Sequence, residues 1–434
     1  MILNLKVEKS LEINELKDLR KLHGFIQGGI KLNYSEISRE LGVDRRTVKK
    51  YITGYEKPKE RNKGSQIDEY YSKIIELLYP ATDEKPKKIF SYKEHLYRYL
   101  IDRNIIKDVK LSTFKHWIKQ NERINEYFRN SKNNIPSLRF ETDLGVQAQV
   151  DWKEDVPFFD NKGKFHRINV LCVFLGFSRF RFYGVSLVKT QEVLFHFLDK
   201  AFESFGGVTK VLVTDNMKTV MDVARTEKYN GKVNTQFQSF ANDYGFEVKP
   251  CIAYKPQTKG KVESPMKILD IITAYNGDLS YVELVEKINE INDNENKRYH
   301  QSYGKIPVLS LQEEKNYLVP LPKQSIRNHY ILKTNTVKVN KSCLAQYKNN
   351  TYSVPVEYMN KTVSLQVFGE YLHIYHNNNL VTIHTVNKAK GVMNYTEEHY
   401  KQIAAMNLPK GMDIESFAKS NLEKIGARKN GYSA

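Results

Sequence analysis

Apolar side chains recur at steps of three and four near the N-terminus, which predicts helices between residues 16 and 51. Ile37 and Leu41 fall on one face of a short helix. Val48 and Ile52 fall on the inner face of the helix that follows it. This pattern predicts two short helices packed against each other.

The residues between and on these helices suit contact with DNA. Gly42 fits a tight turn, and Asp44 fits the cap of the second helix. The candidates for DNA contact on that helix are Arg45, Arg46, Thr47, Lys49 and Lys50. Together these features predict a helix-turn-helix whose second helix enters the major groove. The plainer alternative is a helical hairpin with a solvated basic face.

A second helical module is predicted over residues 65–130, after a basic linker at 56–64. Apolar stripes predict three helices, at 71–78, 91–100 and 111–119, with Ser112 as the cap of the third. On that third helix Lys115 and Lys119 would face outward as DNA contacts. The module is interpreted either as a second helix-turn-helix or as a helical spacer.

The apolar period changes to two at residues 146–152, which is typical of a strand. Further strands are predicted at 167–175, 180–187, 210–214 and 247–251, with a turn at 176–179 and a helix at 190–204. Three antiparallel strands, a helix and another strand indicate an α/β sheet of the ribonuclease-H type. Beyond residue 330, short alternating strands with Asn- and Gly-containing turns predict a small β-barrel.

The chain is therefore expected to be multidomain, with all-α, α/β and all-β parts. The predicted division is an N-terminal helix-turn-helix (1–55), a basic linker (56–64), a second helical DNA-binding domain (65–130), a ribonuclease-H-like core (138–285), a helical connector (286–322), a small β-barrel (323–394) and a helical, basic tail (395–434).

Charge and composition narrow the possible partners. Lys and Arg number 68 against 50 acids, a net charge of +18, which suits a polyanion such as nucleic acid. The sequence has no apolar run long enough to span a membrane, and its N-terminus lacks the features of a secretory signal. Three widely spaced cysteines indicate neither a disulfide framework nor a zinc site. A cytoplasmic protein is expected.

Three acids stand out because of their positions. Asp151 ends the first predicted strand of the sheet, and Asp215 ends the buried fourth strand. These strands are neighbours in a ribonuclease-H fold, and the helix bearing Glu263 would bring a third carboxylate to the same place. Clustered carboxylates repel one another unless cations bind, and Mg²⁺ prefers such oxygen ligands. Two ions could assist phosphoryl transfer, with Mn²⁺ as a possible substitute.

Other residues of this region leave alternatives open. A lone Asp after a strand is more often a turn or cap residue, and Asp155 in the following polar loop is the nearest competitor. Pro265 predicts either a helix that starts at Glu263 or an irregular first turn. Trp152 could be core or could stack on DNA. Candidate phosphate contacts are Lys255, Lys259 and Lys261; Arg179 and Arg181 are either further contacts or solvated.

Three segments resemble the motifs of Asp-Asp-Glu transposases and retroviral integrases: 149–152 (QVDW), 213–216 (VTDN) and 256–263 (PQTKGKVE). The sequence is most similar to IstA-type insertion-sequence transposases, because the interval from Asp215 to Glu263 is long and no N-terminal His/Cys module occurs. The resemblance implies a bacterial enzyme that cleaves and joins DNA with Asp151, Asp215 and Glu263.

The resemblance also implies partners. These are double-stranded transposon ends and target DNA, further copies of the chain on paired ends, and a separate AAA+ ATPase helper of the IstB type. The sequence contains no phosphate-binding loop of its own, in agreement with a separate helper. Two alternatives remain: a catalytically inactive DNA-binding relative, and a nuclease of the same fold that does not join strands.

Overall fold

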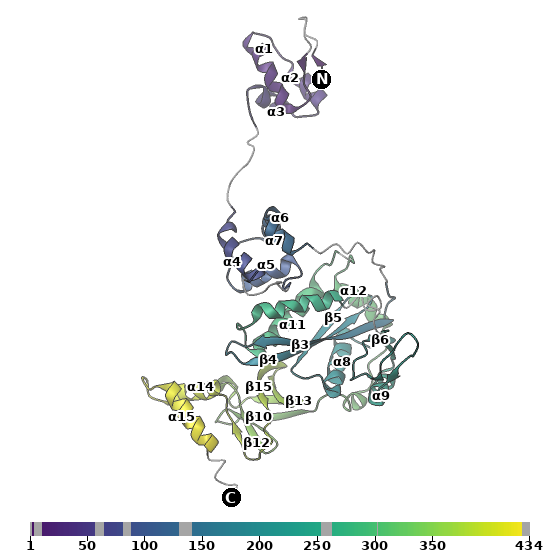
Figure 1. The fold of residues 1–434 in the computed structure, drawn as a ribbon, viewed down its shortest axis with the longest axis vertical. Coiled ribbons are helices and arrows are strands. Elements are labelled where there is room, and N and C mark those ends of the chain that lie inside the picture. Colours follow the sequence, from purple (N-terminus) through teal and green to yellow (C-terminus); the bar gives the residue numbers. More distant parts are fainter. Residues whose placement is uncertain are drawn as a thin grey trace. The chain divides into compact units, whose positions relative to one another are not determined.

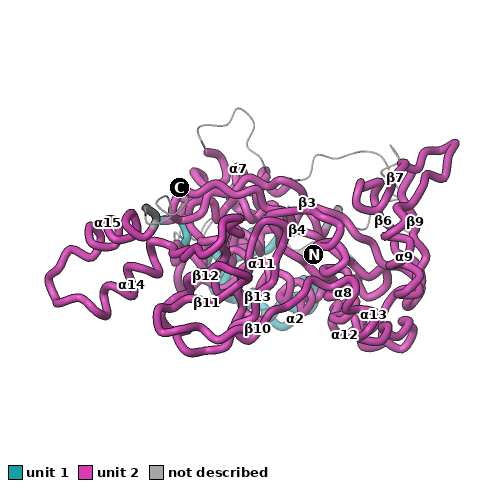
Figure 2. Tube along the Cα trace, turned by 90° about the horizontal axis from the view of Figure 1, so that it is seen from below, with its two compact units in different colours: residues 1–69 teal, residues 70–434 magenta. Residues whose placement is uncertain are grey.

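The computed structural model describes residues 2–3, 11–56, 65–80, 88–129, 141–252, 263–301 and 303–427. These fall into two compact units, residues 1–69 and 70–434 (Figure 2). Of the predicted linker at 56–64, only residue 56 is among the described residues. The predicted phosphate contacts Lys255, Lys259 and Lys261 all lie outside them. Each unit is described by itself below.

The first unit is a small helical domain. Its elements are β1 (Ile2–Leu3), β2 (Leu11–Glu12), η1 (Leu16–Leu22), α1 (His23–Gln27), α2 (Tyr34–Leu41) and α3 (Arg45–Ile52). Ile37, Val48 and Ile52 are buried in one core, as predicted. Gly42 ends α2 with a left-handed φ of 63°, and the Asp44 carboxylate accepts a hydrogen bond from the Arg46 amide at 2.7 Å. The turn and the cap are therefore confirmed.

The boundary between the units falls within η2 (Asp68–Tyr70). The second unit continues with a helical module of α4 (Tyr71–Leu78), α5 (Lys93–Asp102), α6 (Leu111–Gln120) and α7 (Glu122–Tyr127). Phe114, Trp117 and Ile118 of α6 are buried, as the apolar stripe predicts. The predicted cap at Ser112 is wrong. Lys110 occupies the N-cap position and makes no side-chain cap bond, so Ser112 already lies inside the helix.

A five-stranded mixed sheet forms the centre of this unit, in the order β5-β4-β3-β6-β9. The strands are β3 (Gln147–Phe159), β4 (Phe165–Leu175), β5 (Arg181–Ser186), β6 (Val211–Thr214) and β9 (Glu247–Pro250). β3, β4 and β5 are antiparallel, whereas β6 runs parallel to both β3 and β9. This is the expected sheet of the ribonuclease-H type, with the first and fourth strands adjacent.

The first strand is longer than predicted. β3 continues through Asp151 and Asp155 to Phe159 because β4 pairs with it on both sides of a register shift between Lys153 and Val156. Asp151 therefore lies within the strand, level with the end of the neighbouring β6, and Asp155 lies at the irregularity with a φ of 49°. The prediction that Asp155 sits in a loop after the strand is wrong.

Helices cover both faces of the sheet (Figure 1). α8 (Gln191–Phe205) and α9 (Thr235–Tyr244) share one aromatic-rich core with Val150 and Trp152 of β3. The other face carries α10 (Glu263–Ile268), η4 (Leu269–Tyr275) and α11 (Tyr281–Lys297). α11 crosses the predicted boundary at 285–286 and packs on β5, so it belongs to the sheet's covering layer.

The remaining elements lie between and after these layers. They are β7 (Met221–Val223), β8 (Lys232–Val233), α12 (Pro307–Glu314), η5 (Lys315–Tyr317), α13 (Gln324–Arg327), η6 (Val356–Tyr358), α14 (Glu397–Asn407) and α15 (Ile414–Ala427). The last two bear out a helical C-terminal segment.

The predicted C-terminal barrel is not found as a closed ring among the described strands. β10 (Thr334–Lys338), β13 (Thr362–Phe368), β14 (Tyr371–His376) and β15 (Asn379–Thr385) form one sheet, and β11 (Leu344–Tyr347), β12 (Asn350–Ser353) and β16 (Met393–Asn394) form another. The two sheets share one hydrophobic core. The strand pattern was sufficient to predict the strands, but closure depends on which edges pair.

Candidate active site

Two of the three predicted acids lie side by side. β3 and β6 pair in parallel with Val150 opposite Thr214, so the next position on each chain is Asp151 and Asp215. Both carboxylates are partly exposed and line the same open pocket. The parallel register therefore brings together two acids that are 64 positions apart in the sequence.

The pocket around this acid pair is polar, and none of the described residues that line it is basic. Its other lining residues are Trp152, Glu154, Asn216 and Met217. The Trp152 backbone amide donates to Asp151 Oδ1 at 2.9 Å, which helps to orient that carboxylate. An excess of carboxylate oxygens at one point attracts a cation.

The third acid begins a helix on the same side of the sheet as Asp151. α10 starts at Glu263, and Pro265 is its third residue, where no intrahelical N–H bond is needed. Glu263 thus lies in the helix, and the residues before it, on which the choice between the two predicted helix starts depends, lie outside the described residues. The Glu263 side chain lies outside the described part of the structure, as do residues 253–262.

Lys153 and Tyr183 hold this helical segment against the sheet. Strand alternation places Lys153 on the same face as Asp151. Lys153 Nζ lies 2.6 Å from Asp270 Oδ1 of η4, which continues α10. The Tyr183 hydroxyl of β5 donates to the Pro265 carbonyl at 2.9 Å. Burial raises the pKa of Tyr183, so the phenol stays a neutral donor.

Sequence reasoning missed these two residues. The strand period could have indicated that Lys153 shares a face with Asp151, but it gives no information about Asp270, more than 100 positions later. Tyr183 looked like any aromatic residue in a buried strand.

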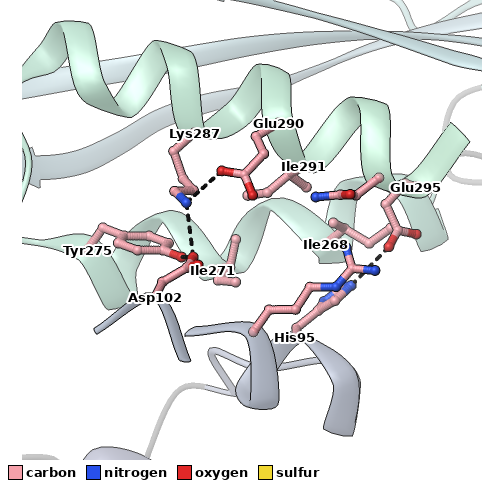
Figure 3. Close-up of a pocket in the computed structure, with 11 residues that line it drawn as sticks. His95, Asp102, Ile268, Ile271, Tyr275, Lys287, Glu290, Ile291 and Glu295 are labelled. Atoms are coloured by element: carbon pink, nitrogen blue, oxygen red, sulfur yellow. Dashed lines mark hydrogen bonds and ion pairs between the residues drawn. The ribbon is translucent and has the colours of Figure 1, made fainter. Parts of the chain in front are cut away.

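The helical module packs on the same segment, as Figure 3 shows. Asp102 of α5 accepts hydrogen bonds from Lys287 Nζ at 2.9 Å and from the Tyr275 hydroxyl at 3.1 Å. His95 Nε2 lies 3.2 Å from Glu295 Oε1 of α11. Residues of α5, η4 and α11 therefore line one small pocket, and the module is held to the helix that starts at Glu263.

Within the described residues, no group of three or more His, Cys, Asp or Glu side chains could hold a metal ion. Two of the predicted ligands are nevertheless paired there, and the third begins α10. The donor set that the described residues give this pocket consists of hard oxygens, mainly carboxylates. These residues fit a divalent cation.

Asp155, the nearest competing acid, has a partner of its own, and so do three other acids of the region, Asp160, Asp222 and Asp243. Asp155 Oδ2 accepts from Lys189 Nζ at 3.2 Å. Asp160 accepts from His166 and two backbone amides in the β3–β4 turn. Asp222 accepts from Asn234, and Asp243 accepts from the Tyr330 hydroxyl.

The basic candidates fall into two groups. On α3, Arg45, Arg46, Lys49 and Lys50 are exposed and Thr47 is half-buried; on α6, Lys119 is exposed. Lys115 is half-buried, 3.5 Å from Glu94 Oε2.

Two arginines differ from expectation. Arg179 and Arg181 are only 6% and 2% exposed, so they are neither solvated nor presented to DNA. Arg179 pairs with Glu141 at 2.7 Å, and Arg181 lies 3.8 Å from Glu295. Trp152 is also buried, with its ring centroid 6.3 Å from that of Phe197, and is a core residue.

Two broader expectations can be compared with the structure. None of the helices in the described residues is both long and apolar enough to cross a membrane. Cys172, Cys251 and Cys343, all within the described residues, are buried and form no disulfide.

Comparisons with known proteins agree with the family that the motifs indicate. The family described as "Integrase core domain" matches residues 145–256, and "Mu transposase, C-terminal domain" matches residues 328–395. The transposase for insertion sequence element IS232 of Bacillus thuringiensis subsp. berliner is 45% identical over 98% of both chains. The transposase for IS21 of Pseudomonas aeruginosa is 26% identical over 84% of this chain and 89% of its own.

A solved structure, the catalytic core domain of BIV integrase, is 16% identical and covers 40% of this chain and 97% of its own, with a TM-score of 0.29. The fold assignment rests on the strand order and on the matched integrase core family.

Proposed function

Because the chain belongs to the IstA-type insertion-sequence transposases, which are Asp-Asp-Glu polynucleotidyl transferases, we propose that Asp151, Asp215 and Glu263 are its catalytic, metal-binding acids. The observation that supports this most directly is the parallel register of β3 and β6, which makes Asp151 and Asp215 neighbours in one pocket. The presence of Glu263 in α10, whose continuation η4 contacts Lys153 of β3, supports the third assignment.

An integrase-type core depends on divalent metal, and we assign the site to two Mg²⁺ ions, with Mn²⁺ as a possible substitute. Asp151, Asp215 and Glu263 would hold them. The bound ions would activate the attacking oxygen and neutralise charge on the phosphate and the leaving oxygen. The carboxylates of Asp151, Asp215 and Glu154, which line one pocket, support this assignment.

Other residues of the chain hold the proposed catalytic acids in position. The Trp152 amide fixes one oxygen of Asp151. Lys153 and Tyr183 fix the segment that starts at Glu263. Phosphoryl transfer depends mainly on such positioning and on charge neutralisation. We propose that water first releases the 3′-end of the element, and that this 3′-hydroxyl then attacks target DNA in line.

DNA contacts are assigned to basic surfaces. α2 and α3 would form a helix-turn-helix that binds transposon ends, with the contacts Arg45, Arg46, Thr47, Lys49 and Lys50. The module of α4 to α7 would bind DNA through Lys119, with Lys115 contributing less because it is paired with Glu94. Lys255, Lys259 and Lys261 would contact phosphates beside Glu263.

The wider assembly follows from the family. We propose that the protein acts in the bacterial cytoplasm, at the nucleoid when bound to DNA, as a multimer on paired ends with an IstB-type AAA+ ATPase delivering target DNA. The predicted division into seven segments remains the proposed organisation, with the core extended to include α11 and a barrel-like domain of two sheets.

The test is a joining assay. Protein, a labelled duplex with the element's terminal sequence, a plasmid and Mg²⁺ are incubated, and joined product is measured with and without the helper ATPase. Asp215→Asn should reduce joining roughly 1,000-fold or more while leaving end binding intact. Asp155→Asn is the matched control, because Asp155 is the nearest competing acid and pairs with Lys189.

Each outcome bears on one reading. Joining that survives in Asp215→Asn would contradict the assignment of the acids. Cleavage without joining, even with the helper, would favour a nuclease. Binding without chemistry in any divalent metal would favour an inactive DNA-binding relative.

A further inference from the structure

In the sequence, a short hairpin of β7 and β8 connects β6, the strand that ends at Asp215, to helix α9. β7 and β8 pair antiparallel, with Met221 opposite Val233 and Val223 opposite Lys232. The tube in Figure 2 shows this hairpin at the outer edge of the second unit. Gly231, with a φ of 78°, lets the two strands approach closely, because an added Cβ would lie 2.7 Å from the Val223 carbonyl oxygen.

The base of the hairpin is hydrogen-bonded to the residue that follows Asp215. Asn216, which follows Asp215, accepts a hydrogen bond from the Arg225 amide at 2.7 Å and donates to the Cys251 carbonyl at 3.0 Å. The Arg225 guanidinium donates to the Pro250 carbonyl at 2.9 Å. The hairpin therefore has a fixed position relative to the ends of β6 and β9.

Two helix starts hold the other side of the base. Gln191 at the start of α8 donates to the Thr219 carbonyl at 2.8 Å and to Asn234 Oδ1 at 3.0 Å. Asn234, the cap of α9, donates its backbone amide to the Val220 carbonyl at 2.8 Å. Hydrogen bonds to α8, to the start of α9 and to β9 therefore hold the hairpin in place within the core.

The outer half of the hairpin is exposed, with a tight turn at its tip. The Thr226 amide donates to the Tyr229 carbonyl at 2.8 Å, and the Tyr229 amide donates to Thr226 Oγ1 at 3.2 Å. Tyr229 is 55% exposed and Val223 is 47% exposed. We define the hairpin surface as these two residues and three exposed lysines: Val223, Tyr229, Lys218, Lys228 and Lys232.

We propose that the hairpin surface binds the DNA whose strand reaches the acid pair, with its lysines on phosphates and the Tyr229 ring against a base. The inference rests on the proposed function. Residues 218–232 carry four basic and two acidic side chains, an excess that suits a polyanion more than a neutral protein surface. An exposed tyrosine on a rigid turn can stack on a base that is unpaired or at a duplex end.

Its position explains why such a contact would matter. A hairpin anchored through Asn216 fixes the DNA relative to Asp215, whereas the first unit reaches DNA through a separate compact body. The contact would place the reacting phosphate at the acids and so contribute to chemistry more than to overall affinity.

The test is photo-crosslinking in the full-length protein. Tyr229→p-benzoylphenylalanine is compared with the same replacement at Tyr317, which is also 55% exposed. Each is irradiated on labelled end duplex, and joining by the same preparation is measured. The expected result is a covalent DNA adduct from position 229, at least tenfold above position 317, mapped to the terminal nucleotides.

Several results would overturn the inference. A crosslink from position 229 to a second copy of the chain would make the hairpin a protein interface. Absence of any adduct from position 229 while the preparation still joins DNA would refute the contact and leave the proposed function standing. Wild-type protein that neither binds nor joins the end duplex would sink both.

A salt titration gives an independent measurement. The slope of log affinity against log salt is negative, and each phosphate contact contributes about −0.9 to it. Lys228→Ala combined with Lys232→Ala should therefore make the slope less steep by roughly 2. Lys200→Ala is the control, since Lys200 is exposed and, like Lys232 with Asp222 at 4.0 Å, lies near an acid, but it belongs to α8 and not to the hairpin. An unchanged slope in the double variant would contradict the phosphate contacts. Tyr229→Ala should reduce joining at saturating DNA roughly tenfold.

Discussion

Glu295 offers the sharpest test of how the helical module is held to the catalytic core. It lies near the end of α11, is only 1% exposed, and is surrounded by two arginines and two histidines, of which His300 lies 3.8 Å away. His95 of α5 lies 3.2 Å from it, Arg298 lies 2.8 Å away, and Arg181 of β5 lies 3.8 Å away. Figure 3 shows the first of these contacts between α5 and α11.

The size of the effect follows from the carboxyl pKa. Burial opposes ionisation, but the hydrogen bond from His95 and the charge of Arg298 outweigh it, so the pKa of Glu295 falls from 4.5 to about 2. A difference of about 2.5 corresponds to ~3 kcal/mol of stability, since each tenfold change is worth about 1.4 kcal/mol. Glu295→Gln keeps the shape and loses this charge, so it should cost about that much.

The pH dependence has a definite sign. A carboxyl whose folded pKa is lowered stabilises the fold above its unfolded pKa, and this contribution disappears as pH falls through the folded value. The difference between wild type and Glu295→Gln should therefore be full above pH 5 and shrink to about 2 kcal/mol by pH 3.5. Little of it should remain below pH 2.

Hydrogen exchange of peptides covering α5 and α11 measures this locally, which suits a chain of several domains. Exchange is compared at pH 7, 5 and 3.5 after correction for the intrinsic rates. Glu290→Gln is the matched control, because Glu290 lies on the same helix and pairs with Lys287 at an exposed site, where a loss below about 1 kcal/mol is expected. Equal protection in wild type and Glu295→Gln at pH 7, or a difference that does not change with pH, would refute the reasoning.

Three further predictions concern the catalytic core. The Arg327 guanidinium donates to both oxygens of the buried Asp199 carboxylate, at 2.6 and 2.9 Å. Arg327→Met leaves that buried charge unpaired, so it should destabilise the core by about 3–5 kcal/mol in urea unfolding. An effect below about 1 kcal/mol would contradict this. Gly184→Ala should lower the melting temperature by several degrees, roughly that of a 1–3 kcal/mol loss, because its Cβ would lie 2.6 Å from the Phe197 ring, and unchanged melting would show that the ring moves freely. Burial lowers the pKa of His196 from 6.5 to about 4, so stability should decline as pH falls from 6.5 to 4; His196→Gln should flatten that decline, and an identical pH profile would count against it.

The sequence by itself determined the local features and the motif chemistry. The alternating period predicted β3, and the apolar runs predicted β4 to β6 and α8, because side-chain spacing directly reflects which face of an element is buried. Asp151 and Asp215 each lie on or directly after a predicted strand, and these two strands are neighbours in a ribonuclease-H sheet. This was sufficient to predict that the two acids lie together.

Only the tertiary structure decided what depends on partners far along the chain. Arg179 and Arg181 looked like solvated or DNA-binding residues, but Glu141 and Glu295 make their burial possible. β3 continues past Asp155 because β4 pairs with it there. The contact between His95 and Glu295 joins residues 200 positions apart. Spacing along one element carries no information about such partners, because their approach is set by the packing of whole elements against one another.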